Sequence, residues 1–322
     1  MNFGGSTAEQ RRQEFLRAAG WNDCSCDSLT GDASARRYFR VRRGSESAIL
    51  MDASLNLESV APFIQLDEHL CRLGFRAPKI LARDPESGFL LLEDFGDSTF
   101  ARLLDEGHDA EQLYRLATDV LIALHSKANA IPAGLRAYHP EKMLEDIELF
   151  LDWRTPGISD LGRVGFRTAW REVLPLAHRV PSTLLLRDYH VANLMLIPGA
   201  TGIAQVGLLD FQDAYKGPVT YDLVSLLEDA RRDLPAGLEE KLMAHYLSHF
   251  PGFDQTEFEI SRAILAAQRH TRVLAIFERL SRRDGKHDYK RLHSPRVERR
   301  LQNALQHPIL AGVKDWMNRH AR

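Results

Sequence analysis

The chain has 322 residues, of which 44% are hydrophobic and 27% are charged, values that are ordinary for a globular protein and exclude a wholly disordered chain. This length allows one large domain or two modest ones, each with a buried core. The 42 basic and 44 acidic residues leave a formal net charge of −2. The overall charge therefore does not favour nucleic acid or a membrane surface as a partner.

The cysteines and the N-terminus indicate a cytoplasmic protein. Cys24, Cys26 and Cys71 are too few and too scattered for a disulfide scaffold, and Cys24 and Cys26 lack the second pair that a structural metal site needs, so we expect free thiols. No apolar run approaches the roughly 20 residues of a membrane-spanning helix. The first residues lack the apolar centre of a signal peptide. We expect no membrane, no nucleic acid and no obligate protein partner.

The first hundred residues read as mostly β-structure. Four short β-prone runs are expected to be strands: 38–43, 48–51, 79–82 and 89–92. The first two form a hairpin through Gly44, and the last two are joined by a turn that ends at Gly88. Between the pairs, Asn56 is expected to cap an amphipathic helix that ends at Gly74.

The remainder reads as mainly helical. Apolar residues recur at helical spacing over 113–124 and 143–151, which predicts helices packed on a core. Three apolar runs, 184–186, 194–197 and 206–209, are flanked by Asp, Asn, Gly or Pro and predict short buried strands. From Tyr221 onward we expect helices, with breaks near Pro235, Pro251 and Pro295. The predicted class is α+β, with a β-rich nucleotide-binding lobe over 1–95, a hinge at about 92–97 and a helical catalytic lobe over 96–322.

Polar residues stand at the ends of the three buried runs. Asp188 ends the first run, Asn193 begins the second and Asp210 ends the third. Carboxylate and amide oxygens suit Mg²⁺, which proteins bind through one or two carboxylates plus phosphate oxygens. Phosphoryl transfer also needs one carboxylate near the attacking hydroxyl and another at the metal. We therefore expect Asp188 to be the base and Asn193 with Asp210 to hold the metal.

The spacing of these residues resembles a known superfamily. The run 186–193, with Asp188, His190 and Asn193, resembles the catalytic loop of the protein-kinase-like superfamily, and more closely its aminoglycoside and choline kinase branch. Asp210-Phe211-Gln212 resembles the metal-binding turn that follows, and Tyr221-Asp222-Leu223 resembles an element whose Asp supports the catalytic loop through backbone hydrogen bonds. The resemblance implies a two-lobed protein-kinase-like fold that uses ATP and Mg²⁺.

Further segments are similar to one bacterial group in that branch. They are 31–41, 91–97, and a late segment that includes Gln268-Arg269-His270 and Pro295-Arg296-Val297. The group includes the anomeric kinases of N-acetylmuramate and N-acetylglucosamine in cell-wall (peptidoglycan) recycling. It implies an ATP-dependent kinase that makes a sugar 1-phosphate. The nucleotide-binding residues that it implies are Gly31, Asp32, Ala33, Ser34, Arg36, Arg40, Glu93 and Phe95.

One departure concerns the cation that faces the nucleotide phosphates. Protein kinases carry a lysine on the third strand, and the corresponding run 48–52 has none. Arg36, Arg37 or Arg40 can supply the charge; without a replacement the chain would be a pseudokinase.

Other roles stay open at this stage. Asp213 is either a second metal-site carboxylate or a turn residue, His190 either a ligand or a hydrogen-bonding loop residue, and Arg269 either part of a solvated helix face or an anion-binding group. The short interval between Asp210 and Tyr221 leaves no room for a peptide-binding activation segment, so we expect a small-molecule acceptor. Besides an amino sugar, the alternatives are an aminoglycoside, choline or homoserine.

Overall fold

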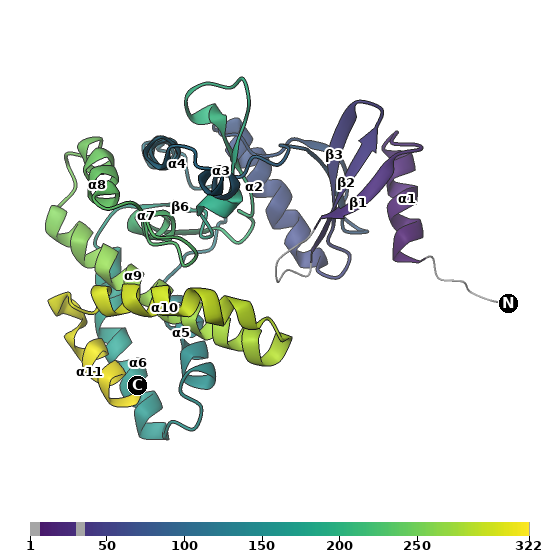
Figure 1. The fold of residues 1–322 in the computed structure, drawn as a ribbon. Helices are drawn as coiled ribbons and strands as arrows, with labels where there is room; N and C mark the ends of the chain where they lie inside the picture. The colour runs from purple at the N-terminus through teal and green to yellow at the C-terminus, as the bar shows by residue number, and fades with distance from the viewer. Residues whose placement is uncertain (1–6, 30–35, 322) are drawn as a thin grey trace. The chain divides into compact units, whose positions relative to one another are not determined.

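The computed structural model describes residues 7–29 and 36–321 (Figure 1). Its contacts divide the chain into two compact units. The first comprises Met1–Leu103 with Ala192–Asp213, and the second comprises Leu104–Val191 with Ala214–Arg322. The expected division at about residue 95 stays a prediction.

The first unit contains a five-stranded antiparallel sheet in the order β1-β2-β3-β5-β4. Its strands are β1 (Ser25–Leu29), β2 (Arg37–Arg43), β3 (Glu46–Asp52), β4 (Ile80–Asp84) and β5 (Phe89–Glu93). Both expected strand pairs are confirmed. Gly88 in the β4–β5 turn has φ +84°, and a Cβ there would lie 2.8 Å from the Ser54 amide nitrogen, so this turn requires glycine.

Helices α1 (Ala8–Ala18) and α2 (Val60–Arg72) lie on opposite sides of this sheet (Figure 1). A capping box between Thr7 and Gln10 begins α1, and its Phe15 and Leu16 pack on Val41, Leu50 and Leu91 of the sheet. A short 3₁₀ helix, η1 (Leu57–Ser59), precedes α2.

The expected cap of α2 is wrong. Asn56 stands before η1, makes no side-chain capping bond, and is separated from α2 by that 3₁₀ turn. The expected end of the helix is confirmed, because α2 stops at Arg72 and Gly74 follows with φ +87°.

A second hairpin belongs to the first unit although it lies a hundred residues further along the chain. It consists of β7 (Leu194–Leu196) and β8 (Val206–Leu208), with the 3₁₀ helices η3 (Val191–Asn193) before it and η4 (Gly202–Gln205) in its loop. The Leu208 amide donates to the Arg76 carbonyl and the Leu196 amide donates to the Ser98 carbonyl, each at 2.8 Å. These backbone bonds attach the hairpin to two segments of the first unit, one before β4 and one after β5.

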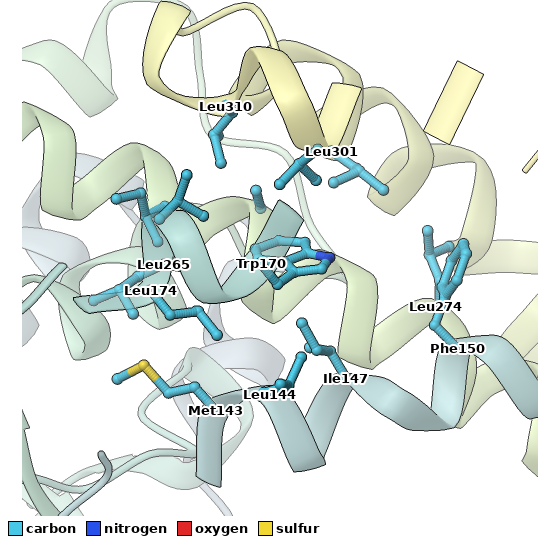
Figure 2. Close-up of a cluster of buried hydrophobic side chains, with 14 of the residues drawn as sticks. Met143, Leu144, Ile147, Phe150, Trp170, Leu174, Leu265, Leu274, Leu301 and Leu310 are labelled. Carbon is cyan, nitrogen blue, oxygen red and sulfur yellow. The ribbon is translucent and has the colours of Figure 1, made fainter. Parts of the chain in front are cut away.

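The second unit is mainly helical. Its elements include α4 (Ala110–His125), α5 (Pro140–Trp153), α6 (Asp160–Val173), η2 (Leu174–His178), α7 (Thr220–Leu227), α8 (Leu238–Ser248), α9 (Gln255–Asp284), α10 (His287–Ala304), η5 (Pro308–Leu310) and α11 (Ala311–His320), after a short α3 (Phe100–Asp105) at the junction. Strand β6 (Ser182–Leu185) pairs with β9 (Tyr215–Pro218). The core gathers side chains of α5, α6, α9 and α10 around the fully buried Trp170 (Figure 2).

The expected helix break at Pro295 is wrong. Pro235 and Pro251 do fall between helices, but Pro295 lies inside α10. Proline removes one helical hydrogen bond and crowds the preceding turn, yet Ser294, Val297 and Leu301 on the same helix are buried. Tertiary packing therefore outweighs the local preference. No helix in the described ranges is long and apolar enough to cross a membrane.

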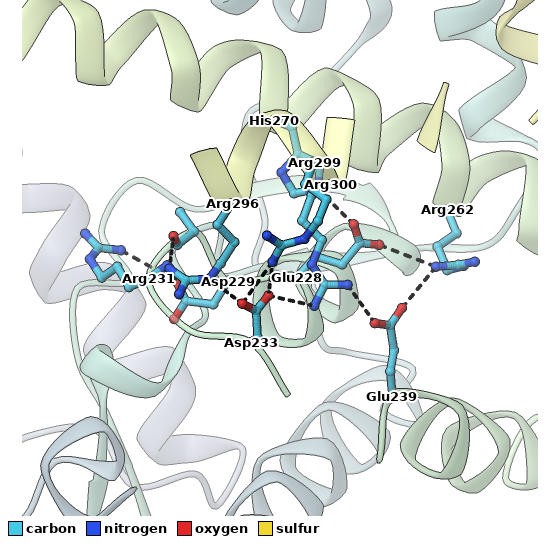
Figure 3. A network of polar contacts seen from close by, with 11 residues as sticks. Glu228, Asp229, Arg231, Asp233, Glu239, Arg262, His270, Arg296, Arg299 and Arg300 are labelled. Atoms are coloured by element: carbon cyan, nitrogen blue, oxygen red, sulfur yellow. Dashed lines mark hydrogen bonds and ion pairs between the residues drawn. The ribbon is translucent and has the colours of Figure 1, made fainter. Parts of the chain in front are cut away.

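An ionic network anchors the segment after α7 (Figure 3). Asp233 accepts hydrogen bonds from Arg296 and Arg299 of α10, and Arg300 of the same helix pairs with Glu239 of α8 at 3.0 Å. Deeper in the unit, Glu228 lies 2.8 Å from the Nε2 of His270 on α9. Helices α9 and α10 thus hold this segment and the start of α8.

Candidate functional site

A cleft of about 560 Å³ lies within the first unit. Its walls come from β2, β3, β5, the segment 93–99 and the β7–β8 hairpin. Of the expected site residues, the cleft brings together Arg36, Arg40, Glu93, Phe95, Asn193 and Asp210. Gly31, Asp32, Ala33 and Ser34, also expected at the nucleotide, lie outside the described residues.

Strand alternation decides which side chains of the first hairpin reach the cleft. Tyr38 and Arg40 line it together with Arg36, whereas Phe39 and Val41 belong to the cluster that packs on α1. This is the two-residue period of a strand. On the paired strand, Ile49 lines the cleft while Ala48 and Leu50 pack toward α1.

The segment 93–99 forms the next wall and is held by Arg40. The guanidinium of Arg40 donates to Asp97 Oδ1 at 2.8 Å, to the Gly96 carbonyl at 2.9 Å and to Asp94 Oδ1 at 3.0 Å. Asp94 and Asp97 were not among the predicted site residues. Two acidic residues on either side of Gly96 were the available signal, because such a pair can hold one arginine from both sides.

Glu93 and Phe95 in the same segment have partners of their own. Glu93 pairs with Arg76, whose guanidinium also lies over the Phe95 ring. A Cβ at Gly207 would come within 2.7 Å of that ring. Glycine at this position therefore lets the β7–β8 hairpin approach Phe95 closely and close the cleft on that side.

Asn193 and Asp210 both lie at the open end of the β7–β8 hairpin: Asn193 precedes β7 and Asp210 follows β8. The Leu209 amide donates to the Asn193 carbonyl at 3.0 Å, so the hairpin itself sets the two residues beside each other. Asp210 has φ +58°, a left-handed conformation that non-glycine residues adopt at a cost and that clusters at functional positions. The Gln212 side-chain amide donates to Asp210 at 2.9 Å and to Asp213 at 3.2 Å.

These residues fit a divalent cation that arrives with a nucleotide. The side chain of Asp210 is 43% exposed, and the Arg36 guanidinium already lies 3.1 Å from its Oδ1, which shows that the carboxylate attracts a cation. No group of three or more His, Cys, Asp or Glu in the described ranges is arranged as a metal cage. One carboxylate and one amide oxygen suit Mg²⁺, which keeps several waters and takes further oxygens from phosphates.

Asp188 lies in the second unit, in the loop that follows β6. Its position is set by the backbone before it: Asp222 accepts the Leu186 amide at 2.6 Å and the Arg187 amide at 2.9 Å. Arg187 itself has φ +72°. Ser225 donates to the Arg187 carbonyl at 3.2 Å, so α7 holds this strained loop through two side chains. Asp222 thus makes the backbone contacts that the resemblance implied.

The charge around Asp188 keeps its carboxylate ionised. Burial raises the pKa of Asp188, but Arg269 and Arg272 outweigh burial and lower it below the ordinary value. Arg269 is buried, donates to the Arg187 carbonyl at 3.3 Å and lies over the Tyr221 ring. Of the two roles left open for Arg269, a solvated helix face is therefore wrong.

His190 and Asp146 complete the surroundings of this loop. Burial lowers the pKa of His190, with Asp229 opposing that shift, and its buried Nδ1 has no hydrogen-bond partner among the described residues. Asp146 of α5 pairs with Arg187 and Lys142. Asp146 was not among the predicted site residues, and the available signal was its i,i+4 spacing from Lys142 on α5.

Comparison with known proteins adds the family. The sequence profile of the phosphotransferase enzyme family matches residues 25–258. An N-acetylmuramate/N-acetylglucosamine kinase of Caulobacter vibrioides is 33% identical over 98% of this chain and 97% of its own length. A protein of the same name from Pseudomonas aeruginosa is 34% identical over 94% of this chain and 92% of its own length.

Solved structures agree on the fold. The choline kinase LicA of Streptococcus pneumoniae matches with a TM-score of 0.65 and 14% identity over 94% of this chain and 99% of that one. An aminoglycoside 2'-phosphotransferase-IIIa in complex with GDP matches with a TM-score of 0.65 and 15% identity over 92% and 99%. The expected protein-kinase-like fold is confirmed. With a profile match over most of the chain and relatives similar along nearly their whole length, the chain belongs to the phosphotransferase enzyme family.

Proposed function

We propose that this protein is an ATP-dependent kinase that transfers the γ-phosphate to the anomeric hydroxyl of N-acetylmuramate, N-acetylglucosamine or both, and so serves peptidoglycan recycling. The observation that carries the catalytic part is the position of Asp188 in a loop anchored by Asp222, where Arg269 and Arg272 outweigh burial and lower the pKa of its carboxyl. The acceptor is inferred from the names of relatives that match this chain almost end to end. We also propose a cytoplasmic location, where ATP is available.

In the proposed reaction, Asp188 orients the anomeric hydroxyl and takes its proton. The sugar oxygen forms a bond to the γ-phosphorus while the bond from that phosphorus to the β,γ-bridging oxygen breaks, leaving ADP and the sugar 1-phosphate. Asn193 and Asp210 would hold Mg²⁺, which when bound neutralises charge on the phosphate oxygens. In the chain, Asp188 precedes Asn193 by five residues, so the base and this proposed metal ligand are joined by a short loop.

The surroundings of Asp188 favour a neutral or anionic acceptor over a cationic one. The positive charges of Arg269, Arg272 and Arg187 all lower the pKa of this carboxyl. The same charges would repel a cationic acceptor such as choline or an aminoglycoside. Nearby, the Oδ2 of Asp229 and the Nδ1 of His190 are buried without hydrogen-bond partners in the described part of the chain. Buried groups of this kind suit the hydroxyls of a sugar.

The test is a product assay with a chemically matched control. The protein is incubated with ATP, Mg²⁺ and a panel of N-acetylmuramate, N-acetylglucosamine, choline and kanamycin, and ³¹P NMR is used to detect a sugar 1-phosphate. The methyl glycoside of N-acetylglucosamine, whose anomeric oxygen is blocked, should give no product. Product from choline or kanamycin alone would overturn the proposed acceptor.

A variant tests the base. Asp188→Asn should lower kcat by about 10²- to 10⁴-fold, the usual contribution of a positioned proton acceptor, while nucleotide binding measured by calorimetry is retained. Asp160→Asn, at an exposed position of α6 in the same unit, serves as the matched control and should behave like the wild type. Equal turnover by Asp188→Asn and the wild type would reject the assigned base and favour a different reaction centre.

A further inference from the structure

We propose that Arg36 supplies the positive charge toward the nucleotide phosphates that a third-strand lysine supplies in protein kinases. This inference rests on the proposed function and names a residue for it. Three arginines at the start of the first hairpin, Arg36, Arg37 and Arg40, are the candidates, and the structure separates them by the face on which each lies and by the partners that each already has.

The third strand itself offers no cation. Ile49 is its residue in the wall of the cleft, and its neighbours Ala48 and Leu50 are fully buried against α1. Among the described residues that line the cleft, only Arg36 and Arg40 carry a permanent positive charge. The replacement therefore has to come from outside the third strand.

Arg37 is excluded by the direction in which it points. It is paired with Asp52 in the register of β2 and β3, and its Nη2 lies 2.8 Å from Asp52 Oδ2. The same carboxylate oxygen also accepts from Arg12 of α1 at 3.1 Å. Arg37 thus belongs to the face of the sheet that α1 covers, away from the cleft.

Arg40 faces the cleft but is committed to the segment 93–99. Its guanidinium is shared among Asp94, Asp97 and the Gly96 carbonyl. A phosphate contact would require Arg40 to give up hydrogen bonds that hold this wall of the cleft in place. We infer that Arg40 shapes the cleft, and that its charge is already balanced by two carboxylates.

Arg36 faces the cleft and points to the expected metal-binding carboxylate. Its side chain is 8% exposed, and its Nη2 lies 3.1 Å from Asp210 Oδ1. A guanidinium binds phosphate oxygens as readily as carboxylate oxygens, often through two parallel hydrogen bonds. Because Asp210 is partly exposed toward the same cleft, Arg36 can keep this carboxylate as a neighbour while it donates to a phosphate group.

The test compares ligands that differ only in their phosphates. Isothermal titration calorimetry measures the affinity of the wild type, Arg36→Ala, Arg36→Lys, Arg37→Ala and Arg40→Ala for ADP with Mg²⁺ and for adenosine. Arg36→Ala should weaken ADP binding by about 10- to 100-fold, the scale of one charged hydrogen bond, and leave adenosine binding unchanged. Arg36→Lys should recover part of the ADP affinity, because it restores the charge without the planar fork.

The other variants are the controls. Arg37→Ala should match the wild type for both ligands, and Arg40→Ala should weaken both alike, because it loosens a wall of the cleft. An unchanged ADP affinity in Arg36→Ala, or an equal loss for ADP and adenosine, would overturn the proposal. If the wild type itself binds no ADP, the proposed kinase function fails as well; if the wild type makes sugar phosphate and Arg36→Ala binds ADP equally well, only the role of Arg36 fails.

Discussion

Replacing Asp222 should unfold the loop that carries Asp188 and destabilise the whole second unit. Asp222 is fully buried and satisfies the amides of Leu186 and Arg187 at 2.6 and 2.9 Å. Asp222→Ala leaves both donors buried without an acceptor, at about 1–3 kcal/mol each, so the free energy of unfolding should fall by about 2–6 kcal/mol. Asp222→Asn keeps one acceptor oxygen and should lose about half as much.

Ser225→Ala is the matched control, because Ser225 is also buried on α7 and donates to the same loop, at the Arg187 carbonyl. It removes one neutral hydrogen bond and should cost only about 1 kcal/mol. Urea denaturation gives the free energies, and steady-state kinetics should show a fall in kcat for Asp222→Ala that exceeds any rise in KM, since Asp188 loses its orientation. A loss of stability in Asp222→Ala no larger than that in Ser225→Ala would refute the reasoning.

Two further predictions concern the core and the ionic network of the second unit. Trp170→Ala should lower the free energy of unfolding by about 3–5 kcal/mol through the cavity that it leaves. The control Leu161→Ala, at an 84% exposed position of the same helix, should change it by less than about 0.5 kcal/mol. Equal urea midpoints for the two variants would contradict the packing in Figure 2. Burial raises the pKa of Glu228, but His270 and Arg262 outweigh burial and hold this pKa below its ordinary value of 4.5. The stability that Glu228 contributes is therefore present above pH 4.5 and is lost as the pH falls through the lower pKa of the folded state. The stability difference between the wild type and Glu228→Gln should therefore shrink from pH 5 to pH 3, and a difference that grows over this range would contradict this assignment.

The elements with a strong local pattern were predictable from the sequence. The hairpin through Gly44, the turn at Gly88 and the amphipathic helices over 113–124 and 143–151 all form as expected, because apolar periodicity and turn residues agree there with the tertiary fold. Helix α1 and strand β1 were missed. Only Phe15 and Leu16 of α1 are buried, and β1 is a polar edge strand with no alternation, so neither carries a hydrophobic pattern; the capping box of Thr7 and Gln10 was the one available signal.

The roles of the cleft residues depend on pairing across the chain, which the sequence alone does not reveal. The register of β2 against β3 decides that Arg37 meets Asp52 and that Arg36 and Arg40 turn the other way. The hairpin that carries Asn193 and Asp210 joins the first unit through backbone bonds to Arg76 and Ser98, which lie far earlier in the chain. Motif spacing predicts which residues carry the chemistry, whereas the partners of these residues are visible only in three dimensions.

The arrangement of β2 and β3 also explains how a phosphotransferase cleft can lack the third-strand lysine. In this chain the cleft-facing position of β3 is the apolar Ile49, and the neighbouring strand places two arginines on that face. One of them, Arg40, pairs with both Asp94 and Asp97. This group of three side chains therefore has a net negative charge. The pairing of Arg36 with Asp210 therefore puts the remaining positive charge of this face next to the carboxylate where phosphates and metal would meet. In our proposal, a cation directly before β2 takes the place of one on β3 and keeps the positive charge that phosphoryl transfer requires, while the cleft-facing residue of β3 is apolar.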